Sequence, residues 1–189
     1  MLLTKHTIGN TRVYDLKSNI NTHLIQSDFN KVTYPYKNLV RIHYKKEHQL
    51  IKVPSNKNYP EFKMLRGTGS EEMVMRSMLF FIEKAEIPEN TKLWIEAFHM
   101  NPYAYIEKEW FFENYSKKAI LCIQRENIEY SKFELRPKRQ KINDRDTFKW
   151  DFRPGEMIMF DADDTFQRYT FMDFTNDQGF QDLLVFTTS

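Results

Sequence analysis

The chain has five histidines, the side chains best suited to acid–base chemistry or metal binding at neutral pH. They are His6, His23, His43, His48 and His99. No two of them are two or four positions apart, so no local spacing brings a pair of ligands together. His99 is the last histidine of the chain, and it alternates with Leu93, Ile95 and Ala97 on a predicted strand. This pattern favours a histidine of the core over an acid–base residue that lines a pocket.

Other reactive side chains have simple structural explanations. The single cysteine, Cys122, lies in the apolar run AILCI, which indicates a small buried side chain rather than a nucleophile. Asp161, Asp163 and Asp164 form an acidic cluster without the glycine and distant glutamate of an EF-hand loop, so a solvated turn is expected. No Gly-x-Ser-x-Gly elbow is present.

Charge gives no strong indication of a partner. The net charge is +2, and the basic stretch from Arg136 to Arg145 is diluted by Asp144. We therefore do not expect nucleic-acid binding. No apolar run is long enough to cross a membrane, and the first ten residues lack the apolar core of a signal peptide. These features predict a cytoplasmic protein, and they leave the oligomeric state open.

The elements that position these residues follow from the apolar periodicity. Hydrophobic residues make up 41% of the chain and aromatic residues 15%, which is typical of a packed, strand-rich domain. Alternating residues predict a hairpin over Asn38–Val53. A helix is predicted over Thr68–Ala85, with Ser70 as its N-cap and apolar residues around more than one side. Six short strands are then expected: Leu93–Met100, Lys118–Arg125, Lys132–Leu135, Glu156–Asp161, Gln167–Met172 and Asp182–Thr187.

The predicted fold class is α+β and mainly β. We expect one domain over residues 1–189, with N-terminal α+β elements over residues 1–92 and a β-barrel core over residues 93–189. The Thr68–Ala85 helix should pack against that core.

Four segments between Trp94 and Thr188 carry a resemblance to a known family. They read LWIEAFHM, CIQRENI, RPGEMIMFDADDTFQRYTF and GFQDLLVFTT. In order and spacing they resemble the iron- and 2-oxoglutarate-dependent dioxygenases, most closely the branch that hydroxylates free amino acids. The resemblance implies a double-stranded β-helix core of the jelly-roll or cupin-like type, preceded by the N-terminal hairpin and helix.

The resemblance also locates the family's functional positions in this sequence. Members hold iron with two histidines and one carboxylate, and an arginine of the last strand binds 2-oxoglutarate. The matching positions here carry Phe111 and Glu113 for the His-x-Asp pair, Gln167 for the distal histidine and Gln181 for the arginine. Phenylalanine cannot ligate a metal, and a neutral glutamine lacks the charge and fork of a guanidinium.

These substitutions lead to a functional hypothesis. We expect a dioxygenase-like fold that has lost its iron and 2-oxoglutarate site, needs no metal or other cofactor, and binds an unknown small organic molecule or acts without a cofactor. Alternation places Gln167, Tyr169 and Phe171 on one face, and Gln181, Leu183 and Val185 on one face. The residues expected to line the pocket are His99, Phe111, Glu113, Tyr115, Gln167, Tyr169 and Gln181.

Two alternatives remain open at this point. One is an active Fe(II)/2-oxoglutarate oxygenase with unusual ligands, which would draw on His99, Glu113 and Asp163. The other is a protein-interaction module that uses the methionine-rich helix or the basic loop.

Overall fold

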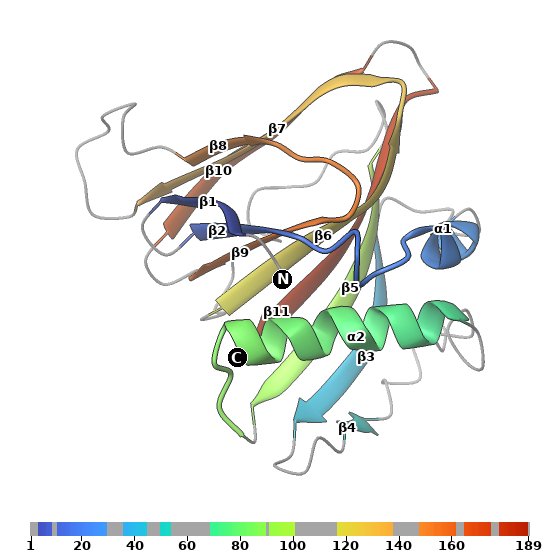
Figure 1. Ribbon diagram of the computed structural model, residues 1–189, viewed down its shortest axis with the longest axis vertical. Helices are drawn as coiled ribbons and strands as arrows, with labels where there is room; N and C mark the ends of the chain where they lie inside the picture. Colours follow the sequence, from blue (N-terminus) through green and yellow to red (C-terminus); the bar gives the residue numbers. More distant parts are fainter. Residues whose placement is uncertain are drawn as a thin grey trace.

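The structure, a computed structural model, describes residues 4–8, 11–29, 36–44, 50–53, 69–89, 91–100, 117–137, 148–161, 165–174 and 178–188. This part of the chain is mostly antiparallel β-structure with two helices, α1 (His23–Phe29) and α2 (Gly69–Lys84) (Figure 1). Neither of these two helices has the length and apolar character needed to cross a membrane.

Within the described residues the strands form two sheets. The larger has the spatial order β1 (Thr4–Ile8), β2 (Thr11–Asp15), β9 (Glu156–Asp161), β6 (Lys117–Glu126), β11 (Phe180–Thr188), β5 (Lys92–Met100), β3 (Tyr36–Tyr44) and β4 (Leu50–Val53). The smaller has the order β10 (Thr165–Phe174), β7 (Ile128–Pro137) and β8 (Phe148–Asp151). The predicted hairpin and all six predicted strands are confirmed, while β1, β8 and α1 were not predicted.

Strands from both ends of the sequence mix in the larger sheet. β2 pairs with β9 along one side, and β3 pairs with β5 along the other. The strands that precede residue 92 therefore extend the sheet formed by β9, β6, β11 and β5, and they do not make a layer of their own.

Helix α2 packs along one face of the larger sheet (Figure 1). The apolar spacing of its sequence explains this, because Val74, Met78 and Phe81 all fall on the buried side. One detail of the sequence prediction is wrong. The helix begins at Gly69, so Ser70 lies in its first turn instead of capping it. Of the residues that extend the apolar surface of the helix, Met73 is buried and Met75 and Phe80 pack against the core, while Leu79 is 37% exposed.

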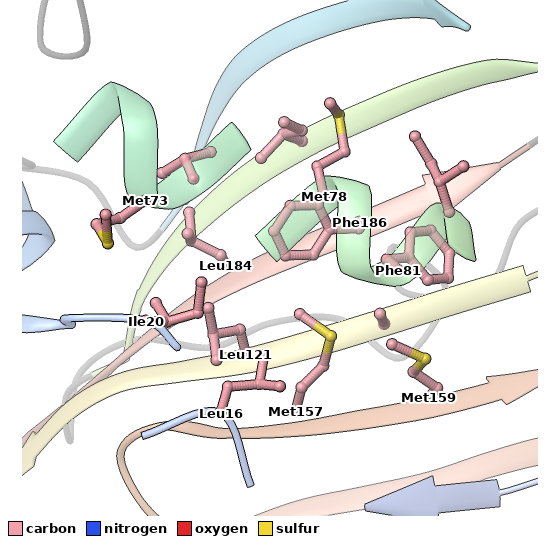
Figure 2. Close-up of a cluster of buried hydrophobic side chains, with 14 of the residues drawn as sticks. Leu16, Ile20, Met73, Met78, Phe81, Leu121, Met157, Met159, Leu184 and Phe186 are labelled. Carbon is pink, nitrogen blue, oxygen red and sulfur yellow. The ribbon is translucent and has the colours of Figure 1, made fainter. Parts of the chain in front are cut away.

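The core between α2 and the sheet is a continuous apolar cluster. Met73, Met78 and Phe81 from α2 face Leu121, Met157, Met159, Leu184 and Phe186 from the sheet, as Figure 2 shows. The rings of Phe81 and Phe186 are 6.2 Å apart between centroids. Burial of this many apolar side chains supplies the main favourable term for docking the helix.

The opposite face of the larger sheet is buried as well. Its residues alternate with those that contact α2, as expected for neighbouring positions of a strand. We call this set the inner row. It comprises Val13, Lys118, Ile120, Cys122, Glu156, Ile158, Phe160, Gln181, Leu183, Val185 and Thr187.

Candidate functional site

Gln181 stands at the start of β11 in the inner row, and its side chain is fully buried. It lies opposite Arg125 of β6 on one side and Met100 of β5 on the other. Its Nε2 atom donates to the carbonyl oxygen of Phe152 at 3.2 Å and to the sulfur of Cys122 at 3.3 Å. The amide that replaces the expected arginine is therefore tied to its surroundings by its own hydrogen bonds.

Arg125 shares the acceptor that Gln181 uses. Its Nη1 atom donates to the Phe152 carbonyl oxygen at 3.1 Å and to Asp151 Oδ1 at 2.7 Å. The two side chains of this ion pair are 17% and 23% exposed. Arg153 approaches the other oxygen of the same carboxylate at 3.3 Å, and its side chain is 63% exposed. The guanidinium nearest to Gln181 in register is thus held by a carboxylate and a carbonyl of the protein.

A tight turn delivers a buried carboxylate to the same region. The nitrogen of Glu156 donates to the oxygen of Arg153, with Pro154 and Gly155 between them and a φ of 82° at Gly155, which matches a type II turn. The carboxylate of Glu156 accepts from Trp150 Nε1 at 2.9 Å and from the Arg153 nitrogen at 3.0 Å. Glu156 is buried but hydrogen-bonded, as a charged group in an interior must be.

The turn is also fixed to its neighbours through the backbone. The nitrogen of Gly155 donates to the Cys122 oxygen, and the oxygen of Gly155 accepts from the Leu16 nitrogen, each at 2.9 Å. A Cβ atom at Gly155 would lie 2.6 Å from Cγ of Lys17. Both the positive φ and this close approach explain why glycine occupies the position.

Cys122 is a buried, neutral thiol. Burial raises its pKa to about 12, against a smaller lowering effect of the hydrogen bond from Gln181. Nucleophilic cysteines need an accessible thiolate at neutral pH, so the sequence interpretation of Cys122 as a small buried side chain is confirmed.

The rest of the inner row is mainly apolar. Ile120, Ile158, Leu183 and Val185 are buried side by side on three adjacent strands. Lys118, only 1% exposed, ends the row near Thr187. The inner row therefore has a hydrogen-bonded polar end at Gln181, aliphatic side chains in its middle, and Lys118 and Thr187 at its other end.

Four of the seven predicted pocket residues lie in the described part of the chain: His99, Gln167, Tyr169 and Gln181. Gln181 lies in the inner row together with Leu183 and Val185, as alternation predicted. His99 lies opposite Asp182 of β11, the residue next to Gln181. By alternation its backbone position is on the same face of β5 as Leu93 and Ile95, which is the face toward α2 and not the inner row of Gln181. The shared row of His99 with those two residues is as expected.

β10 has a register irregularity between Gln167 and Tyr169, whose backbone positions lie opposite Leu135 and Glu134 of β7. The predicted common face of these two residues stays a prediction. The remaining predicted residues, Phe111, Glu113, Tyr115 and Asp163, lie outside the described part of the chain.

The cofactors that the resemblance implies are iron and 2-oxoglutarate. Among the described residues, no three His, Cys, Asp or Glu side chains are grouped so as to hold a metal ion. Gln181, which the resemblance matches to the 2-oxoglutarate arginine, brings no positive charge, and its amide nitrogen already donates to a carbonyl oxygen and a sulfur atom. This position does not fit a 2-oxoglutarate carboxylate.

Sequence reasoning missed the polar cluster around Phe152. Arg125 belongs to β6 of the larger sheet and Asp151 to β8 of the smaller sheet. No local spacing in the sequence indicates that these two residues form an ion pair. A signal did exist for Glu156, since a glutamate directly after Pro-Gly at the start of an apolar run needs buried partners.

Neither a protein-family model nor a curated protein matches this sequence. Solved structures do match. IDO from Bacillus thuringiensis superposes with a TM-score of 0.72 at 12% identity, covering 96% of this chain and 90% of that one. The Fe(II)/α-ketoglutarate-dependent dioxygenase TqaL gives 0.69 at 7% identity, with 95% and 82% covered. An oxidoreductase of the 2OG-Fe(II) oxygenase family from Burkholderia pseudomallei gives 0.56 at 13% identity, with 95% and 85% covered.

At such identities the likeness is one of fold alone. The expected dioxygenase-like fold is confirmed, while the free-amino-acid hydroxylase branch and the loss of the cofactor site stay predictions.

Proposed function

We propose that this chain is a double-stranded β-helix protein that has given up iron- and 2-oxoglutarate-dependent oxidation and instead binds a small, uncharged or amphipathic organic molecule in the former active-site interior. It needs no metal for this role.

The topology supports the double-stranded β-helix. Along the chain, β5 and β6 belong to the larger sheet, β7 and β8 to the smaller, and β9, β10 and β11 alternate between the two. Strands that cross repeatedly between two antiparallel sheets are the pattern of jelly rolls. Trp150, at the end of the smaller sheet, donates to Glu156 of the inner row, which agrees with an inner row that faces this sheet.

The single observation that carries the proposal is the state of Gln181. It occupies the matching position for the arginine that binds 2-oxoglutarate, it is neutral, and its Nε2 atom is committed to the Phe152 carbonyl and the Cys122 sulfur. The absence of any histidine after His99 removes the distal iron ligand independently of the alignment.

The inner row sets the class of ligand. Ile120, Ile158, Leu183 and Val185 offer an aliphatic surface, which suits an apolar or amphipathic molecule better than a charged one. The hydrogen-bonded end at Gln181 supplies polarity to orient such a molecule.

The experiment uses the amphipathic fluorophore 8-anilinonaphthalene-1-sulfonate as the probe. We expect saturable fluorescence enhancement with the native protein, and a loss of affinity of roughly tenfold or more in Val185→Phe, because the larger ring fills the space the probe needs. The melting temperature of Val185→Phe should change little. Leu79→Phe, on the exposed side of α2, is the matched control and should bind the probe as the parent does.

The opposite result would count against a pocket. If the interior is filled, an added ring at Val185 overpacks it and lowers stability by about 1–3 kcal/mol. A large drop in melting temperature for Val185→Phe, with probe binding unchanged where the fold survives, contradicts the proposal.

A further inference from the structure

A hollow of about 240 Å³ lies at the C-terminal end of α2, on the α2 side of the larger sheet. Residues from β2, β6, β9 and the turn after α2 line it. Arg12 of β2 pairs in register with Met159 of β9, whose side chain belongs to the core beneath α2. Gln181 does not line the hollow, while Lys118 and Phe160 of the inner row border it together with the residues on the α2 side.

The hollow is lined by charged residues of both signs: Arg12, Lys84, Lys117, Lys118, Glu86 and Asp161. Four of them are engaged. Lys84 pairs with Glu83 at 2.9 Å, Lys117 donates from Nζ to the oxygen of Ala85, and Lys118 and Asp161 each have an interaction of their own. Within the described part of the chain, the side chains of Arg12 and Glu86 form no hydrogen bond or ion pair. One unpaired cation and one unpaired anion thus border the same space.

Glu86 occupies its position against two local preferences. The nitrogens of Glu86 and Ile87 bond back to the oxygens of Glu83 and Ile82, at 3.3 and 3.0 Å, which is the Schellman ending of a helix. Glu86 is the residue with left-handed backbone in this motif, at φ 51°, where glycine is favoured. Its negative charge also stands at the negative end of the helix dipole.

Glu86 has an unfavourable backbone conformation and an unfavourable charge for this position, and its side chain makes no interaction with the described residues that would compensate. Such positions are often functional sites. Glycine or asparagine would end α2 better, yet the chain places a carboxylate here, at the wall of a hollow that the unpaired guanidinium of Arg12 also lines.

We propose that this hollow binds a small organic zwitterion, whose anionic group meets the guanidinium of Arg12 and whose ammonium group meets the carboxylate of Glu86. The molecule is smaller than a typical drug-sized ligand, since pockets for those measure roughly 300–1,000 Å³. The site does not depend on the proposed function of the inner row.

Thermal unfolding with a matched set of probes tests the site. The zwitterions are glycine, β-alanine, 4-aminobutyrate and 6-aminohexanoate, and each is compared with the n-alkyl carboxylate and the n-alkylammonium ion of equal length. At least one zwitterion should raise the melting temperature by a few degrees at saturating concentration, through preferential binding to the folded chain. The single-charge analogues should not.

Variants locate the effect. Arg12→Gln and Glu86→Gln should each abolish the shift, while Lys17→Gln and Glu129→Gln, which alter exposed charges that do not line the hollow, should leave it intact. The proposal is overturned if no zwitterion shifts the melting temperature, if a carboxylate analogue shifts it equally, or if the shift persists in both Arg12→Gln and Glu86→Gln.

Discussion

Gln181 and Arg125 lie opposite each other on β11 and β6, and both donate a hydrogen bond to one atom, the carbonyl oxygen of Phe152, at 3.2 and 3.1 Å. By the resemblance alone, the neutral amide takes the position of an arginine in the dioxygenases. The guanidinium of Arg125 lies on the neighbouring strand and is bound to Asp151. Polar groups that are held by the protein in this way contribute to the fold, and their removal should be measurable as lost stability.

Replacing Gln181 by leucine should lower the free energy of unfolding by about 1–2 kcal/mol. The change removes two donated hydrogen bonds in a buried site, although Arg125 still satisfies the Phe152 carbonyl. For a chain of this length the melting temperature should fall by roughly 2–8 °C. Leu183→Met, a change of similar volume in the same row, is the control and should have a smaller effect. An unchanged or raised melting temperature in Gln181→Leu would mean that these two hydrogen bonds do not contribute to the stability of the fold.

Gly155→Ala should destabilise the fold by about 1–2 kcal/mol, because the residue has a φ of 82° and its new Cβ would lie 2.6 Å from Lys17 Cγ. Chemical denaturation measures the loss. In a Lys17→Ala background the close contact disappears but the backbone strain remains, so only part of the loss should return. Full recovery in that background would show that the backbone conformation costs nothing.

Glu86→Gly should stabilise the protein by about 0.5–1 kcal/mol, since glycine adopts the left-handed conformation without strain and removes a carboxylate from the helix C-terminus. The matched substitution Glu83→Gly, inside α2, should instead destabilise by about 1 kcal/mol. A loss of stability in Glu86→Gly would disagree with the Schellman geometry at this end of α2.

Cys122 should resist alkylation in the native state. With a pKa of about 12 in the folded chain, its thiolate is a minute fraction at pH 8, whereas unfolding restores the ordinary value of 9.0. The stability linked to this group is therefore complete below pH 9 and is lost as the pH rises toward 12, because the unfolded chain then releases a proton that the folded chain retains. Above pH 9, the parent should lose stability more steeply than Cys122→Ala. Rapid, stoichiometric labelling of the folded protein at pH 8 would disagree with this burial.

Local periodicity was enough to predict α2, the β3–β4 hairpin and six strands. The apolar spacing of Val74, Met78 and Phe81 specifies a helix face, and this signal does not depend on distant contacts. β8 escaped prediction because four residues with two charges carry too little alternation. The irregularity at Gln167 and Tyr169 also has no sequence signature, since it depends on how β7 pairs with β10.

The candidate site was predictable only in part. The position of Gln181 followed from the order of motifs, but its partners Phe152 and Cys122 come from other strands and from the connection after β8. Likewise, the alternation of Leu93, Ile95 and His99 was readable, but whether that row faces α2 or the smaller sheet depends on tertiary packing.

We propose that the Gln181 position does not bind 2-oxoglutarate. Equilibrium dialysis of the purified chain with isotopically labelled 2-oxoglutarate and ferrous iron, under anaerobic conditions, tests this without knowledge of any further substrate. We predict no saturable binding of 2-oxoglutarate and no retained iron, since Gln181 lacks a guanidinium and no histidine follows His99. Binding of one equivalent each of iron and 2-oxoglutarate per chain would contradict it.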